Sequence, residues 1–270
     1  MRFWLWLLYD KNPDFDFTKQ LDITNAKTID PPEAIIDTVE GKDWIMLKMK
    51  CVMKETWQVH DFPFDKQHLK VQIENSILDN SVLIFKPDQK GSMFDDEEAV
   101  DGWAIKNFKV SSRENYYATG FGDPREGRNQ QTFSQFVIEM DIERDAWGLF
   151  MKIFLGMYIA FLIAIISFTP HPSEMEPRFG LPVGGLFAAV GNKYIIDSLL
   201  PESSTFSLVD TLHALTFIAI FATLLVSAIA LKQFDYGKKE MAERTNRRGA
   251  RIVVTLYVAF NMIFIVLALI

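Results

Sequence analysis

The sequence has little cysteine and lacks common catalytic motifs. Cys51 is the only cysteine among 270 residues, so no disulfide can form within the chain and no second thiolate exists for a zinc site. There is no P-loop and no GxSxG motif, and the four histidines are scattered. Lysine and arginine form no basic stripe interleaved with aromatic residues. We therefore expect neither an enzyme nor a nucleic-acid-binding protein.

The N-terminal segment lacks the features of a signal peptide. Residues 3–9 are apolar, but this run is short for a signal-peptide core, and no small-residue cleavage site follows it. We interpret the run as an aromatic β-strand.

The composition changes near residue 145. The earlier part is polar and acidic, whereas residues 146–270 contain four long apolar segments. Each approaches the ~20 residues that a helix needs to cross ~30 Å of hydrocarbon. Three of them have few or no internal charges, which favours membrane spans over buried helices of a soluble protein. The expected helices comprise residues 147–169, 179–200, 207–231 and 252–270.

The second of these segments differs from the others. It contains several glycines together with Pro182, Lys193 and Asp197, which are poorly suited to contact with lipid. Polar and small residues at membrane depth normally face protein or water. Two interpretations remain open, a re-entrant or interfacial segment and a pore-lining helix.

The distribution of basic residues predicts the orientation in the membrane. Residues 232–251, between the third and fourth segments, hold seven basic residues, whereas the turn at 201–206 holds none. Basic loops stay in the cytoplasm. We therefore expect a multi-pass protein of the inner cell membrane, with the N-terminal half and the C-terminus outside or periplasmic. Export of that half needs a signal peptide, so we expect the chain to lack its natural beginning.

Residues 1–145 show short strand-like runs separated by turn residues. Alternation or β-rich apolar composition marks eight runs, which is typical of an all-β sandwich. Eight strands are slightly few for a closed sandwich, which again suggests that N-terminal strands are missing. The expected fold class is an immunoglobulin-like extracellular sandwich followed by a four-helix transmembrane bundle. The runs are residues 3–9, 20–26, 44–53, 54–59, 68–75, 81–86, 103–110 and 135–143.

One motif carries a family resemblance. Residues 62–67 read FPFDKQ, after a strand and about 80 residues before the first apolar segment. This resembles the FPFDxQ signature of the pentameric ligand-gated (Cys-loop) receptors. The positions of the family's cysteines correspond to Glu55 and Leu69, so the disulfide is absent, as in the prokaryotic, bacterial branch. The resemblance implies a homopentamer with an extracellular ligand-binding domain and an ion-conducting pore.

The FPFD segment is expected to couple the sandwich to the pore. Aromatic–proline bonds such as Phe62–Pro63 are prone to the cis form, which builds a tight turn, and Phe64 would anchor that turn against apolar neighbours. Asp65 needs a cationic partner if it is buried. Arg144 is the candidate, because the family carries an arginine just before its first span; alternatively, both charges are solvated. The resemblance also places the turn that begins at Pro201 against this segment.

The second apolar segment carries a stripe of residues at steps of four and three, which lie on one side of a helix. Five such helices would line a channel in which Phe187 forms a narrow apolar ring. Counting back from Pro201, by resemblance, puts Glu176 at the cytoplasmic mouth, as in cation-selective members, although Arg178 could invert selectivity if it faced the axis. Alternatively, the stripe is a helix-packing face. The predicted pore-lining residues are Glu176, Gly180, Gly184, Phe187, Gly191, Tyr194 and Ser198.

Two further segments are candidate ligand sites. Residues 115–132 match the hairpin over the family's agonist pocket, where Tyr116, Tyr117 and Phe121 would form an aromatic cage for a cation; the alternative is ordinary strand aromatics. An acidic run offers oxygen ligands that suit Ca²⁺, or is a solvated loop. No resident cofactor is expected, and Ca²⁺ modulation is a hypothesis. The acidic residues are Asp95, Asp96, Glu97 and Glu98.

The leading functional prediction is a subunit of a pentameric ligand-gated channel. It would be cation-selective and gated by an extracellular small molecule, a proton or a divalent ion. The alternative is a membrane-anchored extracellular binding or sensor module that does not conduct. The expected partners are further copies of the chain, membrane lipids, permeant ions and an unknown small-molecule ligand.

Overall fold

The computed structural model describes residues 1–12, 15–95, 101–123, 130–198, 200 and 205–269. The chain divides into two compact units. The β unit comprises Met1–Trp57 and Lys66–Glu143, and the helical unit comprises Gln58–Asp65 and Arg144–Ile270. The expected boundary at residue 145 is therefore close, but the loop at 58–65 belongs to the helical unit.

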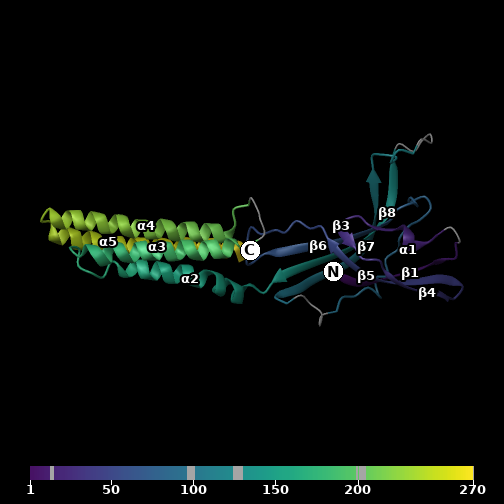
Figure 1. The fold of residues 1–270 in the computed structure, drawn as a ribbon, viewed down its shortest axis with the longest axis horizontal. Helices are drawn as coiled ribbons and strands as arrows, with labels where there is room; N and C mark the ends of the chain where they lie inside the picture. Colours follow the sequence, from purple (N-terminus) through teal and green to yellow (C-terminus); the bar gives the residue numbers. More distant parts are fainter. Residues whose placement is uncertain (13–14, 96–100, 124–129, 199, 201–204, 270) are drawn as a thin grey trace. The chain divides into compact units, whose positions relative to one another are not determined.

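The described part of the β unit forms two four-stranded sheets (Figure 1). In one sheet β5 pairs with β1, β3 and β4, and the other has the order β2-β6-β8-β7. A short helix, α1 (Phe17–Gln20), precedes β2. The strands are β1 (Arg2–Asp10), β2 (Leu21–Ile23), β3 (Ala26–Ile29), β4 (Glu33–Val39), β5 (Lys42–Met53), β6 (Lys66–Asn75), β7 (Trp103–Tyr117) and β8 (Gln131–Arg144).

The two sheets pack against each other through one apolar core. Alternate residues of β5, such as Leu47 and Met49, are buried, as the period of two in a strand requires. They share a cluster with Val71 and Ile73 of β6, from the other sheet, and with Phe17 of α1. The β unit is therefore a sandwich with its core between the sheets.

Two of the expected strands are wrong, and two observed strands were not expected. Residues 54–59 and 81–86 form no strand. Phe85 nevertheless packs on the core, and its backbone N–H donates to the side chain of Ser134 (Oγ, 2.9 Å) instead of to a neighbouring strand.

Strands β3 and β4 escaped prediction because they lack an alternating apolar pattern. Every residue of β4 is exposed. A tight turn explains its position, because Glu40 and Gly41 both have positive φ (50° and 81°), the geometry that joins β4 and β5 in a two-residue hairpin.

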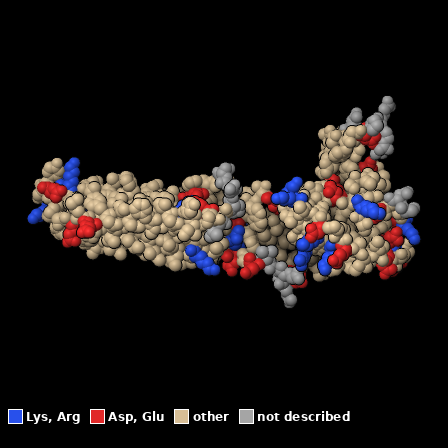
Figure 2. Space-filling view, in the orientation of Figure 1, with Lys and Arg blue, Asp and Glu red and all other residues tan. Residues whose placement is uncertain are grey.

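The helical unit contains four long helices that run side by side (Figure 1). Each is long and apolar enough to cross a membrane, which is the architecture of a multi-pass membrane protein. Figure 2 shows a broad band of this unit without charged side chains on the face in view. The helices are α2 (Ala146–Ile166), α3 (Met175–Asp197), α4 (Leu208–Asp235) and α5 (Lys239–Leu269).

The fourth helix begins earlier than expected. A long basic loop was predicted at residues 232–251, but α5 starts at Lys239 and only residues 236–238 separate it from α4. An apolar pattern detects only the part of a helix that lies in hydrocarbon. The charged turns of α5 continue the helix, with i,i+4 ion pairs that link Arg244 to Glu240 and Arg247 to Glu243. Likewise α3 starts at Met175 rather than at residue 179.

Candidate functional site

Helix α3 packs against its neighbours along one narrow face. The buried residues recur at steps that place them on one side of the helix. At Gly185 the backbones of α2 and α3 lie close together, because a Cβ atom at this position would lie 2.6 Å from the carbonyl oxygen of Ala160 in α2. This face therefore fixes the rotation of α3 about its own axis. It comprises Arg178, Pro182, Gly185, Ala189 and Ile196.

The predicted pore-lining stripe lies on the opposite side of α3. At ~100° per residue, its members are centred roughly opposite the packed face, and all seven are exposed. Phe187 and Tyr194 have 73% and 78% of their surface exposed. A Cβ atom on Gly184 would meet nothing within 4 Å. Within the chain, then, the stripe is not a helix-packing face.

Glu176 and Arg178 point to different sides of α3. Glu176 is exposed in the first turn. Arg178 is fully buried; its Nη1 donates to the carbonyl of Pro170 at 3.0 Å, and its Nη2 donates to Asn246 Oδ1 of α5 at 2.6 Å. The arginine is thus held inside the helical unit and does not share the face of Glu176.

A polar cluster ties the C-terminal end of α3 to α4. Lys193 forms ion pairs with Asp197 and, at 2.7 Å, with Asp210. Asp210 also forms a capping box with Ser207 at the start of α4. Lys193 therefore partly neutralises the negative charge of Asp197.

A second cluster lies deeper in the same region. Asn192 Nδ2 donates to the carbonyl of Ile153 and to His213 Nε2, both at 3.1 Å. His213 Nδ1 in turn donates to the carbonyl of Val209 at 2.8 Å. Asn192 was not among the candidate residues predicted from the sequence. Polar side chains within otherwise apolar spans were the available signal.

The FPFD loop, which comprises residues 58–65, packs onto the ends of α2 and α4. The Phe62–Pro63 peptide bond is cis. Phe64 is buried against the rings of Trp147 and Phe150 in α2, with centroid distances of 5.4 and 5.5 Å. The backbone N–H of Leu208, the first residue of α4, donates to the carbonyl of His60 at 2.8 Å. The loop therefore contacts both α2 and α4.

The predicted pair of Asp65 and Arg144 is present in the structure. Arg144 Nε donates to Asp65 Oδ1 at 2.6 Å and its Nη2 donates to Oδ2 at 3.1 Å, a bidentate arrangement. The side chain of Asp65 is 1% exposed and that of Arg144 is 21% exposed, so the alternative of two solvated charges is wrong. The guanidinium also lies 5.0 Å from the ring centre of Phe62. The coupling role of the pair remains a prediction, and Pro201 lies outside the described residues.

A hydrogen bond lies beside Glu55 and Leu69, the two positions that would hold cysteines according to the resemblance. Glu55 accepts a hydrogen bond from the backbone N–H of Lys70 at 3.0 Å, next to Leu69. Cys51 is free and buried in the sandwich core, and burial raises the pKa of its thiol.

In the β unit, two of the three predicted ligand-binding aromatics lie together. The rings of Tyr117 and Phe121 are 5.2 Å apart, and Phe133 lies 5.8 Å from Tyr117. Tyr116, the adjacent residue in β7, points to the other face of its strand. It is exposed, and its hydroxyl donates to Gln130 Oε1 at 2.5 Å.

A buried carboxylate lies beside this aromatic cluster. Glu74 is almost fully buried and accepts hydrogen bonds from the Tyr117 hydroxyl at 3.0 Å, Asn115 Nδ2 at 2.7 Å and Gln135 Nε2 at 2.5 Å. Burial and then the hydrogen bond to Glu74 raise the pKa of Tyr117 to about 12. Sequence reasoning missed Glu74, because its three donors come from β7 and β8, far along the chain.

The predicted Ca²⁺ ligands are mostly outside the described residues. Asp95 is described and exposed, whereas Asp96, Glu97 and Glu98 are not described. Within the described ranges, no group of three His, Cys, Asp or Glu side chains is arranged to hold a metal ion.

No protein-family model matches the chain, and no curated protein matches its sequence. The class of this protein is instead defined by its fold. It is a multi-pass membrane protein that also contains a β-sandwich unit.

Proposed function

We propose that this protein is one subunit of a pentameric ligand-gated, cation-selective ion channel of the Cys-loop receptor type. The observation that carries the proposal is the exposed face of α3. It combines three glycines with Glu176, Tyr194 and Ser198, and it lies opposite the face that packs within the chain. Such a face suits a neighbouring copy or a water-filled pore better than lipid.

Ion conduction would follow the length of this stripe. A ring of Glu176 side chains would concentrate cations at one mouth. Arg178 would not oppose that ring, because its guanidinium is held between Pro170 and Asn246. The Phe187 side chains of the five subunits would together form an apolar constriction, and the pore would stop conducting when water leaves that constriction.

Gating would use the FPFD loop. Lys66 and Glu143 are paired residues of β6 and β8, and the residues next to them in the chain are Asp65 and Arg144. A displacement of these two strands would thus act directly on the buried ion pair. Phe64 and the His60–Leu208 hydrogen bond would transmit it to α2 and α4.

The ligand would bind to the β unit, which we propose is immunoglobulin-like and extracellular. The Tyr117–Phe121–Phe133 cluster beside Glu74 supplies aromatic faces and one carboxylate. This combination favours a cationic ligand.

Current recordings in planar bilayers test the proposal. We expect the purified full chain to conduct cations when small amines, acidic pH or divalent ions are applied to the side of the β unit. Phe187→Ala should increase spontaneous opening, and Glu176→Gln should lower the cation-to-anion permeability ratio. Matched controls are Ile195→Ala on α3 and Glu174→Gln at the residue just before this helix, which change exposed residues outside the stripe.

Two results would overturn the proposal. One is the absence of current under every condition, with ligand binding intact, which would favour the non-conducting sensor module. The other is an equal response to the stripe variants and to their controls.

A further inference from the structure

The charged end of α5 has a fixed orientation. Its buried face includes Ala242, Asn246 and Val253. Asn246 accepts a hydrogen bond from Arg178 and donates one to the carbonyl of Phe168 at 2.8 Å. At Gly249 the backbone lies so close to α4 that a Cβ atom would be 2.4 Å from Val226 Cγ1. These contacts determine which residues of α5 face away from the helical unit.

Three arginines lie on the face of α5 that points away. Arg244, Arg248 and Arg251 follow at steps of four and three, so they form one stripe about 10 Å long. All three are exposed. The same side of the helix continues towards the C-terminus with Val258 and Met262, which are exposed and apolar. The arginine stripe is thus the charged end of an apolar face suited to lipid.

Few acidic side chains of the chain neutralise the positive charge of the arginine stripe. Arg244 lies 3.8 Å from Glu240, and both side chains are largely exposed. Within the described part of the chain, Arg248 and Arg251 take part in no ion pair.

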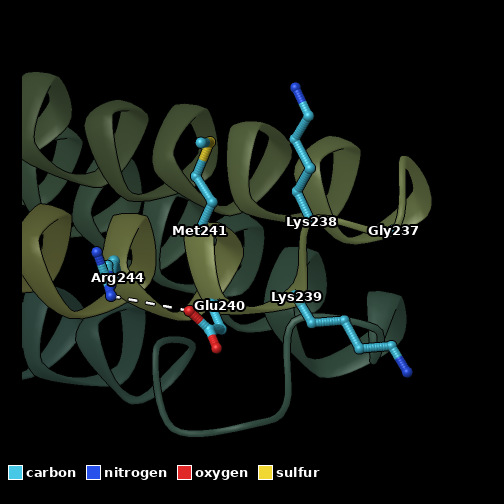
Figure 3. Close-up of a pocket in the computed structure, with 6 residues that line it drawn as sticks. All are labelled: Gly237, Lys238, Lys239, Glu240, Met241 and Arg244. Carbon is cyan, nitrogen blue, oxygen red and sulfur yellow. Dashed lines mark ion pairs between the residues drawn. The ribbon is translucent and has the colours of Figure 1, made fainter.

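The nearby hollow at the α4–α5 turn, by contrast, is not a built anion site. Figure 3 shows the side chains of Lys238 and Lys239 pointing apart, and Arg244 directed towards Glu240.

We propose that the arginine stripe binds the phosphate headgroup of anionic phospholipids, with the acyl chains along the apolar face of α5. Guanidinium groups bind phosphate oxygens through paired hydrogen bonds. The basic residues at this end favour a cytoplasmic location, where the leaflet is anionic. The inference requires that α5 spans a bilayer and that its charged end lies at a leaflet with anionic lipids. It does not depend on conduction, so its failure and that of the channel proposal are distinguishable.

Native mass spectrometry of the detergent-solubilised full chain tests the proposal. Phosphatidylglycerol and phosphatidylcholine are titrated against the wild type, a triple variant (Arg244→Gln, Arg248→Gln, Arg251→Gln) and a control variant (Lys238→Gln, Lys239→Gln, Arg247→Gln). The control loses the same charge at the same end of the helix. We expect the triple variant to lose at least about tenfold in affinity for phosphatidylglycerol, at about fivefold per fully engaged arginine, and the control to retain wild-type affinity.

Three outcomes would overturn the inference. They are equal losses in both triple variants, equal wild-type affinity for the two lipids, and full competition by glycerol 1-phosphate, which would indicate a soluble anion. If the triple variant does not remain folded, the single variants Arg248→Gln and Arg251→Gln are measured in the same assay. Each should weaken phosphatidylglycerol binding about fivefold and leave phosphatidylcholine binding unchanged.

Discussion

Helices α3 and α5 distribute their polar residues in opposite ways. Along most of its length α3 packs small apolar residues such as Gly185 and Ala189 inward, and its outward face combines glycines with polar residues near the two ends of the helix, such as Tyr194. In its membrane part α5 buries Asn261 and exposes Val258. The outward face of α5 suits hydrocarbon, whereas that of α3 does not. We therefore propose that exposed residues of α5 contact lipid, whereas exposed residues of α3 contact water or another copy of the chain.

The largest expected effect compares one aromatic residue from each helix. Tyr257 of α5 is buried, stacks on Phe161 with a centroid distance of 3.7 Å and hydrogen-bonds Thr216. Tyr257→Ala should lower the free energy of unfolding by about 3–5 kcal/mol, because it leaves a large cavity among the helices. Phe187→Ala should change it by less than about 0.5 kcal/mol. Thermal and denaturant unfolding of the full chain in detergent measures both. Similar losses would mean that Phe187 packs within the subunit.

The next effect compares the two sides of α5. Asn246→Leu should cost about 2–3 kcal/mol, because the buried guanidinium of Arg178 loses an acceptor and the carbonyl of Phe168 loses a donor. Thr255→Leu, on the exposed side, replaces one polar side chain in the same way and should leave stability unchanged. Unfolding under the same conditions measures both. A neutral Asn246→Leu would show that water replaces this network, and the orientation assigned to α5 would lose its main support.

A third substitution tests which outward face meets hydrocarbon. Val258→Gln should destabilise the protein in lipid nanodiscs by about 2 kcal/mol, because an amide in hydrocarbon lacks partners. Phe187→Gln, near the middle of α3, should not, if that face meets water. Melting temperatures in nanodiscs measure the difference. Equal losses would place both faces in lipid and remove the basis for a pore.

Much of this contrast could be predicted from the sequence. Long apolar segments indicated four spans, a recurrence at steps of four and three identified the outward stripe of α3, and one motif paired Asp65 with Arg144. The first two signals are local in the sequence and the third depends on a family resemblance, so none of them requires knowledge of the tertiary structure.

The remaining features depend on residues far apart in the chain. Glu74 is buried because side chains from β7 and β8 converge on it. The inward direction of Arg178 depends on Asn246, 68 residues away. The charged turns of α5 carry no apolar signal, and β4 has no buried face to reveal it.

The smallest effect concerns two adjacent glycines. A Cβ atom on Gly185 would lie 2.6 Å from the carbonyl oxygen of Ala160, whereas one on Gly184 would meet nothing within 4 Å. Gly185→Ala should therefore destabilise the helical unit by about 1–2 kcal/mol, because α2 and α3 must separate. Gly184→Ala should be neutral or stabilising by up to about 1 kcal/mol, since alanine favours the helix. Denaturant unfolding of the two variants measures the difference, and the reverse order would mean that α3 is rotated from the position that exposes its stripe.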